Sequence, residues 1–180
     1  MKKYDAIFLD RDGTLNPDTG YISSLKDFEF YDFTINALKK MSVLSSSFCI
    51  ITNQSGLARG KIDVDQLSEI HNYILNQFYK NNLNLIGIYF CPDHPDKPSI
   101  NRKPGSGMFD SAARDHNINL NKSIMIGDAV SDIQAGLNLD MDTMLVLTGR
   151  GQNSKDNLNG LAPKHIVENI MAGAELMEKL

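Results

Sequence analysis

The sequence has little of several features that mark specialised classes of protein. It contains two cysteines, Cys49 and Cys91, which are too few for a disulfide framework. No apolar run approaches the roughly 20 residues that a membrane-spanning helix needs, and no signal peptide precedes the first apolar segment. We therefore expect a cytoplasmic protein without a membrane partner.

Positive charge is also scarce, because 18 Lys and Arg residues face 22 Asp and Glu residues, for a net charge of −4. This balance argues against a broad basic face and a nucleic-acid partner, although a local cationic pocket would not show in such totals. Internal repeats, low-complexity tracts and insertions long enough to form a separate cap are absent. The length and the 42% hydrophobic content predict a single domain, residues 1–180, which we expect to be a monomer.

Five short apolar segments predict strands that are covered on both faces: 6–9, 48–52, 86–91, 123–126 and 143–147. Helical spacing predicts helices at 35–44, 67–78, 108–116, 132–138 and 166–177, the second of them after a cap at Asp63 or Asp65. The segments 16–32, 92–107 and 149–163 are rich in loop-forming residues. Alternating strands and helices predict an α/β fold, a three-layer α/β/α sandwich around a parallel sheet.

In such a sheet, ligands bind beyond the carboxyl ends of the strands. The first predicted strand ends in Asp10-Arg11-Asp12-Gly13-Thr14, and its two carboxylates would repel each other without a cation between them. Oxygen ligands beside a phosphate favour Mg²⁺. We infer that Asp10 attacks phosphorus and that Asp12 acts as the general acid and base. Taken alone, the segment could also be an ordinary Asp-Gly turn.

Three further loops carry suitable groups. Thr52 can donate a hydrogen bond to a phosphoryl oxygen, and Arg102-Lys103 supplies the positive charge that phosphoryl transfer requires. Asp128 is a candidate metal ligand, and Asp132 could orient Lys103 or the water shell of the metal. Each loop alone could be a polar turn or a solvated surface, but the four in this order predict a phosphatase active site.

These residues resemble the four motifs of the haloacid dehalogenase (HAD) superfamily of phosphotransferases: Asp10-x-Asp12-x-Thr14, Thr52, Lys103 and Gly127-Asp128-(x)3-Asp132. The resemblance spans almost the whole chain. It implies a Rossmann-like sheet in the order 5-4-1-2-3, an aspartyl-phosphate intermediate, and Mg²⁺ held by Asp10, the carbonyl of Asp12, and Asp128.

Within the superfamily, the segments 52–60, 20–21, 91–95 and 102–108 are similar to those of the D-glycero-D-manno-heptose 1,7-bisphosphate 7-phosphatases. That resemblance implies removal of the 7-phosphate of this sugar in nucleotide-heptose biosynthesis. It also implies a group of substrate-binding candidates: Tyr21, Asn53, Ser55, Arg59, Arg102 and Lys103. Tyr21 could instead be a loop packing residue.

The sequence departs from that family at its structural zinc site, which the resemblance would place at a Cys-x-His and a Cys-x-Cys pair. Cys91 remains, but Asp93, Ser99 and Asn101 replace the other ligands. A tetrahedral structural site needs four nitrogen or sulfur ligands, so we predict that zinc is absent. The neighbouring Cys91, Asp93 and His94 leave a weaker metal site open.

Three alternative functions remain at this point. A polynucleotide 3′-phosphatase has a similar Thr-Asn-Gln segment and a similar Arg-Lys-Pro segment, but the acidity of this chain argues against it. A histidinol-phosphate phosphatase is less similar in the loop after Thr52. A non-catalytic module with the same fold is disfavoured, because every catalytic position is filled. His71 is predicted to flank its helix and to take no part in catalysis.

Overall fold

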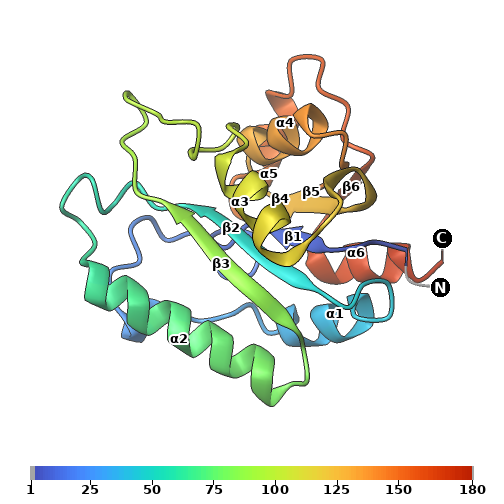
Figure 1. The fold of residues 1–180 in the computed structure, drawn as a ribbon, viewed down its shortest axis with the longest axis horizontal. Helices are drawn as coiled ribbons and strands as arrows, with labels where there is room; N and C mark the ends of the chain where they lie inside the picture. The colour runs from blue at the N-terminus through green and yellow to red at the C-terminus, as the bar shows by residue number, and fades with distance from the viewer. Residues whose placement is uncertain (1–2, 180) are drawn as a thin grey trace.

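The computed structural model describes residues 3–179, which build six parallel strands into one sheet (Figure 1). In chain order the strands are β1 (Ile7–Leu9), β2 (Phe48–Asn53), β3 (Leu85–Cys91), β4 (Ile124–Gly127), β5 (Asp142–Val146) and β6 (His165–Val167). Their spatial order is β3-β2-β1-β4-β5-β6. The predicted order of the first five strands is therefore confirmed, and β6 is an addition at one edge.

The helices are α1 (Thr34–Met41), α2 (Val64–Lys80), α3 (Gly107–His116), α4 (Val130–Asn138), α5 (Gly151–Asp156) and α6 (Ile170–Met177). Two short 3-10 helices, η1 (Leu25–Asp27) and η2 (Leu120–Lys122), lie in the connections. Of the two predicted caps, Asp63 begins α2, because its side chain accepts a hydrogen bond from the backbone N–H of Asp65. No helix of residues 3–179 is both long enough and apolar enough to cross a membrane.

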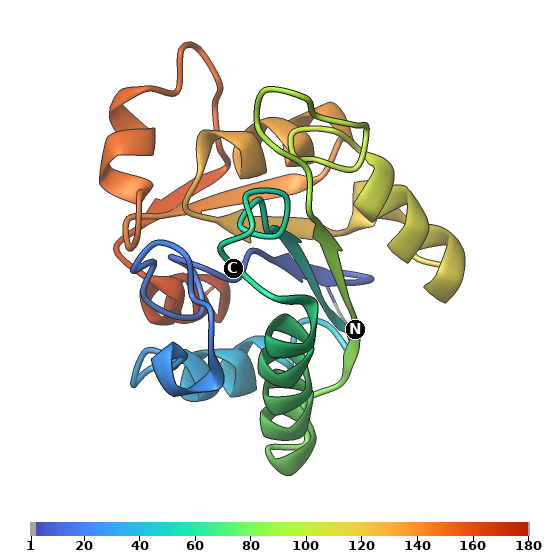
Figure 2. The ribbon, with the colours of Figure 1, turned by 90° about the vertical axis from the view of Figure 1, so that its left-hand side faces the viewer.

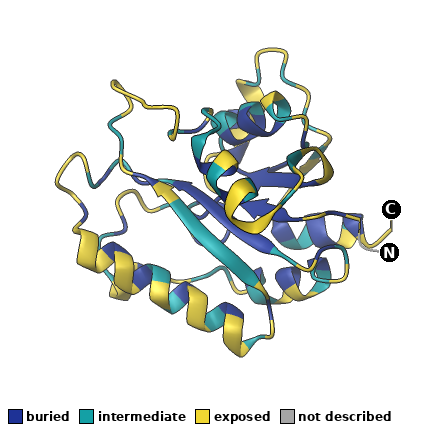
Figure 3. Cartoon of the chain, viewed as in Figure 1, coloured by how far each residue is buried: buried dark blue, intermediate teal, exposed yellow. Residues whose placement is uncertain are grey.

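Helices cover both faces of the sheet, with α1, α2 and α6 on one side and α3 and α4 on the other (Figures 1 and 2). The alternation of side chains along β1 separates two cores. Ile7 and Leu9 join the core under α1, α2 and α6, whereas Phe8 packs on Phe109 of α3 with ring centroids 5.4 Å apart. Figure 3 shows the central strands buried throughout and the outer surface of α2 exposed. This confirms the three-layer sandwich.

Two predictions about the C-terminal third are wrong. The predicted helix at 166–177 is divided, because residues 165–167 form β6 beside β5 and α6 begins only at Ile170, after the Asn169 cap. The segment 149–163, predicted as a loop, contains α5. A three-residue strand is too short to show an alternating pattern, and Ile166 and Ile170 imitate helical spacing.

Candidate active site

The predicted catalytic residues surround one cavity of about 420 Å³ at the carboxyl ends of the strands. Asp10 directly follows β1, Thr52 is the second-to-last residue of β2, and Asp128 directly follows β4. Lys103 comes from the long loop after β3. Parallel strands point their carboxyl ends to the same edge, so residues far apart in sequence meet there.

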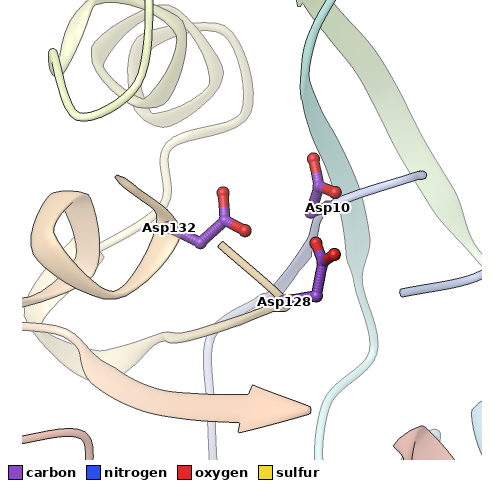
Figure 4. A group of neighbouring side chains, drawn as sticks. All are labelled: Asp10, Asp128 and Asp132. Carbon is purple, nitrogen blue, oxygen red and sulfur yellow. The ribbon is translucent and has the colours of Figure 1, made fainter. Parts of the chain in front are cut away.

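Three carboxylates from this set form a tight cluster. Asp10, Asp128 and Asp132 each offer an oxygen, and these oxygens all lie within 4.8 Å of one another (Figure 4). Burial raises the pKa of Asp10 to about 7, and the nearby charge of Asp132 adds to the shift while Lys103 opposes it. Burial also raises the pKa of Asp128 to about 8, together with the charges of Asp10 and Asp132. The cluster therefore holds more negative charge than its protein neighbours neutralise.

Lys103 partly offsets this charge. Its Nζ lies 2.6 Å from Oδ1 of Asp10 and 2.7 Å from Oδ1 of Asp132, and it donates to the carbonyl of Ile51 at 2.6 Å. Burial lowers the pKa of Lys103, but the charges of the two aspartates outweigh burial and raise it above its ordinary value. Lys103 is therefore a permanently charged ammonium group.

Asn53 fixes the backbone on which Lys103 stands. Its Oδ1 accepts from the N–H of Lys103 at 3.1 Å, and its Nδ2 donates to the carbonyl of the same residue at 3.2 Å. Both the oxygen and the nitrogen of the Asn53 amide are thus hydrogen-bonded to the backbone of Lys103. Asn53 also lines the cavity, which is expected of a substrate-binding candidate.

The carboxylate of Asp12 receives four hydrogen bonds. Arg11 donates through Nε to Oδ1 at 2.9 Å and through Nη2 to Oδ2 at 2.8 Å. Asn16 donates to Oδ1 at 3.0 Å and Gln54 to Oδ2 at 2.8 Å. Burial raises the pKa of Asp12, but the charge and hydrogen bonds of Arg11, with those of the two amides, outweigh burial and hold the pKa below its usual range.

Two glycines leave room for the Asp128 carboxylate. A Cβ on Gly13 would lie 2.2 Å from Oδ2 of Asp128, and a Cβ on Gly149 would lie 2.3 Å from the same atom. The backbone N–H of Arg150 donates to that oxygen at 2.7 Å. A side chain at either glycine would clash with the carboxylate, so the two glycines let the Asp128 side chain pack directly against their loops. The clustered, under-neutralised carboxylate oxygens line the cavity and fit a hard divalent cation.

The substrate-binding candidates lie on the wall of the same cavity: Tyr21, Asn53, Ser55, Arg59 and Arg102. Tyr21 is 47% exposed, so it belongs to the rim. The predicted role of His71 outside catalysis agrees with its place behind the site, where its Nε2 lies 3.5 Å from Arg11 and burial lowers its pKa to about 4.

Three further residues at this site were not predicted from the sequence. Arg11 is completely buried and Gln54 is 3% exposed, and both hold Asp12. Arg150 lines the cavity and pairs with Asp18 at 3.0 Å between Nε and Oδ2. Arg11 lies within the first motif and Gln54 within the segment that follows Thr52. Their positions in the sequence therefore indicated a role at the site, but their residue types did not indicate which role.

The loop that departs from the expected zinc pattern is held by hydrogen bonds. Oδ2 of Asp93 accepts from the N–H of Ser99 at 2.7 Å, and Oγ of Ser99 accepts from the N–H of Asn101 at 3.2 Å. Nη1 of Arg102 donates to the carbonyl of Asp93 at 3.1 Å. Cys91 is buried at the end of β3. The side chains of Asp93, Ser99 and Arg102 thus form hydrogen bonds within the loop.

Comparisons with known proteins point to one family of enzymes. Residues 100–172 match the HAD-hydrolase-like family model. The D-glycero-β-D-manno-heptose-1,7-bisphosphate 7-phosphatase of Photorhabdus laumondii is 39% identical over 158 residues, which cover 83% of this chain and 84% of that protein. The enzyme of the same name from Escherichia coli K12 is 37% identical over 176 residues, or 89% and 92% of the two chains.

A solved structure agrees as well. The D,D-heptose 1,7-bisphosphate phosphatase of B. bronchiseptica, complexed with magnesium and phosphate, is 30% identical and superposes with a TM-score of 0.87 over 99% of both chains. Identity above one third over most of the length, together with a shared fold, defines common membership. The chain therefore belongs to the D-glycero-β-D-manno-heptose-1,7-bisphosphate 7-phosphatase family of the HAD-like hydrolases.

Proposed function

We propose that this protein removes the 7-phosphate of D-glycero-β-D-manno-heptose 1,7-bisphosphate through an aspartyl-phosphate at Asp10. The observation that carries the chemistry is the grouping of Asp10 and Asp12, after β1, with Lys103 and Asp128 around one cavity. Family membership supports the substrate, because the relatives carry this sugar phosphate in their names.

In the first step, a carboxylate oxygen of Asp10 attacks phosphorus, and the bond between phosphorus and the C7 oxygen breaks. Asp12 gives its proton to the departing oxygen. Its lowered pKa in the substrate-free protein favours the ionised form. The negative charge of the arriving phosphoryl group raises that pKa, because like charges disfavour ionisation, and thereby lets Asp12 carry the proton.

In the second step, water attacks the phosphorus of the aspartyl-phosphate. Asp12, now ionised, takes the proton of the attacking water, and the bond between phosphorus and the Asp10 oxygen breaks to release inorganic phosphate. Lys103 places its ammonium group 2.6 Å from Asp10, where it offsets charge that develops on the phosphoryl oxygens. The four hydrogen bonds to Asp12 favour this base role.

Mg²⁺ fits the carboxylate cluster, and we assign it to Asp10 and Asp128, with the backbone carbonyl of Asp12 as a third ligand and Asp132 behind them, next to Lys103. The raised pKa values of Asp10 and Asp128 and the close approach of the three carboxylates support this assignment. When bound, Mg²⁺ supplies charge neutralisation that lets an anionic phosphate approach an anionic nucleophile.

The sugar and its second phosphate would bind along the cationic wall of the cavity. Arg59, Arg102 and Arg150 line it, with Ser55 and Tyr21 beside them. Guanidinium groups bind phosphate in a two-pronged geometry, so they suit a substrate with a phosphate at each end.

Phosphate release from a panel of sugar phosphates at fixed Mg²⁺ tests the proposal. The panel holds both anomers of the heptose 1,7-bisphosphate, histidinol phosphate and a 3′-phosphorylated oligonucleotide. We expect the β anomer to give the highest kcat/KM. Equal, slow turnover of all the sugars would contradict the heptose assignment, and preference for the oligonucleotide would replace it with a polynucleotide phosphatase.

A further inference from the structure

The buried amide of Gln54 connects two of the proposed catalytic groups. Its Nε2 donates to Oδ2 of Asp12 at 2.8 Å and to Oγ1 of Thr52 at 2.9 Å. Arg11 and Asn16 also donate to Asp12, but both reach it from its own loop. Gln54 instead follows β2, so it joins the loop of β1 to the end of the neighbouring strand.

The hydrogen bond to Thr52 decides which way its hydroxyl points. A threonine hydroxyl has one hydrogen and two lone pairs, and one lone pair is occupied by the N–H of Gln54. Within residues 3–179, no protein acceptor is found for the hydroxyl hydrogen. Thr52 lines the cavity, so this hydrogen is free to donate to a phosphoryl oxygen there.

The second hydrogen of the same amide limits the motion of Asp12. Arg11 holds one edge of the carboxylate through both oxygens, and Gln54 adds a bond to Oδ2 from the opposite loop. Because the Gln54 side chain is 3% exposed, water does not readily replace either of its bonds. A buried donor with two fixed acceptors is a preorganised element.

We propose that Gln54 is a positioning residue that orients the Thr52 hydroxyl as a donor and the Asp12 carboxylate as acid and base. The inference rests on the proposed function, since it assigns those two roles to Thr52 and Asp12. Gln54 also lines the cavity, but we assign it no contact with the phosphoryl group, so it acts through Thr52 and Asp12. Its effect is therefore on kcat, with little effect on the binding of the remote parts of the substrate.

Gln54→Met tests this role, because methionine has a similar length and no donor. We expect kcat/KM to fall roughly 10- to 100-fold, mostly through kcat, on both p-nitrophenyl phosphate and the heptose bisphosphate. The thermal midpoint and the Mg²⁺-induced shift of that midpoint, both measured by calorimetry, should stay close to those of the wild type. Gln66→Met, at an exposed position of α2, is the matched control and should keep full activity.

A double-mutant cycle separates positioning from a general packing defect. In a Thr52→Val background the hydroxyl is missing, so the cost of Gln54→Met should shrink at least roughly threefold. An equal cost in both backgrounds, or wild-type kcat in Gln54→Met, would overturn the inference. If the wild-type protein itself gave no Mg²⁺-dependent turnover, the proposed function would fail instead, so the two failures are distinguishable.

Discussion

Asp10 is a buried carboxyl that lies close to the carboxyls of Asp128 and Asp132, and this proximity defines its chemistry. At neutral pH its pKa of about 7 leaves it close to half protonated in the metal-free protein. A nucleophile must be ionised, so the site needs additional positive charge beyond the single ammonium of Lys103. Asp128, whose pKa is raised to about 8, also needs additional positive charge nearby to be ionised at neutral pH.

Asp10→Asn should abolish turnover, with a loss of at least roughly 10³-fold in kcat, because an amide cannot form the acyl phosphate. Phosphate release measures it, with mass spectrometry to exclude deamidation back to Asp. Asp96→Asn, on an exposed side chain, is the control and should be as active as the wild type. Retained turnover in Asp10→Asn would remove Asp10 from the nucleophile role.

Asp128→Asn should make the metal-free protein more stable at pH 8, by roughly 1–2 kcal/mol in urea unfolding. The folded pKa of Asp128, about 8, lies above its ordinary value of 3.8. A raised carboxyl pKa contributes stability that is fully present below the unfolded value and is lost as the pH rises through the folded value. The uncharged asparagine does not lose this stability as the pH rises, and its side-chain oxygen can still accept the hydrogen bond from the backbone N–H of Arg150.

The difference between the variant and the wild type should shrink as the pH falls toward the ordinary value of 3.8, because below that value the carboxyl is protonated in both the folded and the unfolded protein. An Asp128→Asn protein that is less stable than the wild type at pH 8 without metal would show that the carboxylate charge is compensated in the protein. That result would argue against the cation site.

The residues around Asp12 show how far side-chain roles follow from sequence. Spacing after a predicted strand was sufficient to bring Asp10, Thr52 and Asp128 together, because parallel strands end at one edge. Arg11 was not predictable in this way. Neighbouring side chains on a strand point to opposite faces, and only the turn after β1 lets Arg11 fold back onto Asp12 with both nitrogens.

Among the elements, those with continuous apolar sequence were predicted within one or two residues. β1, β2, β4 and β5 lie where buried runs were expected, since burial on both faces leaves a strong signal. β3 was also placed correctly, although it is an edge strand that is mostly half-buried, with Phe90 40% exposed. β6 and α5 lack that signal, because β6 has three residues with Ile166 41% exposed, and α5 is a short polar helix. Their places depend on β5, against which β6 pairs.

The loops after β1 and β5 meet at two glycines, which makes Gly149 a test of the loop packing. Gly149 has φ +56°, and an added Cβ would lie 2.3 Å from Oδ2 of Asp128 and 2.5 Å from Cα of Gly13. Gly149→Ala should therefore displace Asp128, lower the free energy of unfolding by roughly 2–4 kcal/mol and weaken the Mg²⁺-induced rise in thermal midpoint.

Gly160→Ala is the matched control for this change. Gly160 also has a positive φ, +89°, but an added Cβ there meets nothing within 4 Å. It should show only the backbone cost of roughly 1 kcal/mol and a normal response to Mg²⁺. Equal costs at both positions, with equal Mg²⁺ responses, would mean that the space beside Asp128 is not needed.

In the whole molecule, the under-neutralised carboxylates lie at the carboxyl ends of the strands, and an apolar core packs on each face of the sheet. The cores on the two faces hold β1 rigidly, so the carboxylates cannot separate to relieve their repulsion. Protons or a cation must do so. The stability of the entire chain is thereby linked to what occupies the end of the sheet.

Mg²⁺ should raise the thermal midpoint of the wild type, and the rise should be larger at pH 8 than at pH 6. Protons occupy Asp10 and Asp128 below their folded pKa values of about 7 and about 8, and there they compete with the cation. Differential scanning calorimetry at both pH values, with Ca²⁺ as a comparison ion, measures the effect. A Mg²⁺ shift independent of pH would contradict a site built on these two carboxyls.

The central place of β1 has a consequence for biosynthesis. β1 is translated before the other strands of the sheet, whereas its neighbour β4, Asp128 and Gly149 are translated much later. The nucleophile-bearing segment therefore leaves the ribosome long before the groups that hold its counter-ion exist. Catalytic competence should therefore arise only after Asp128 and Gly149 have been made, so a nascent chain that ends before them should not hydrolyse phosphate.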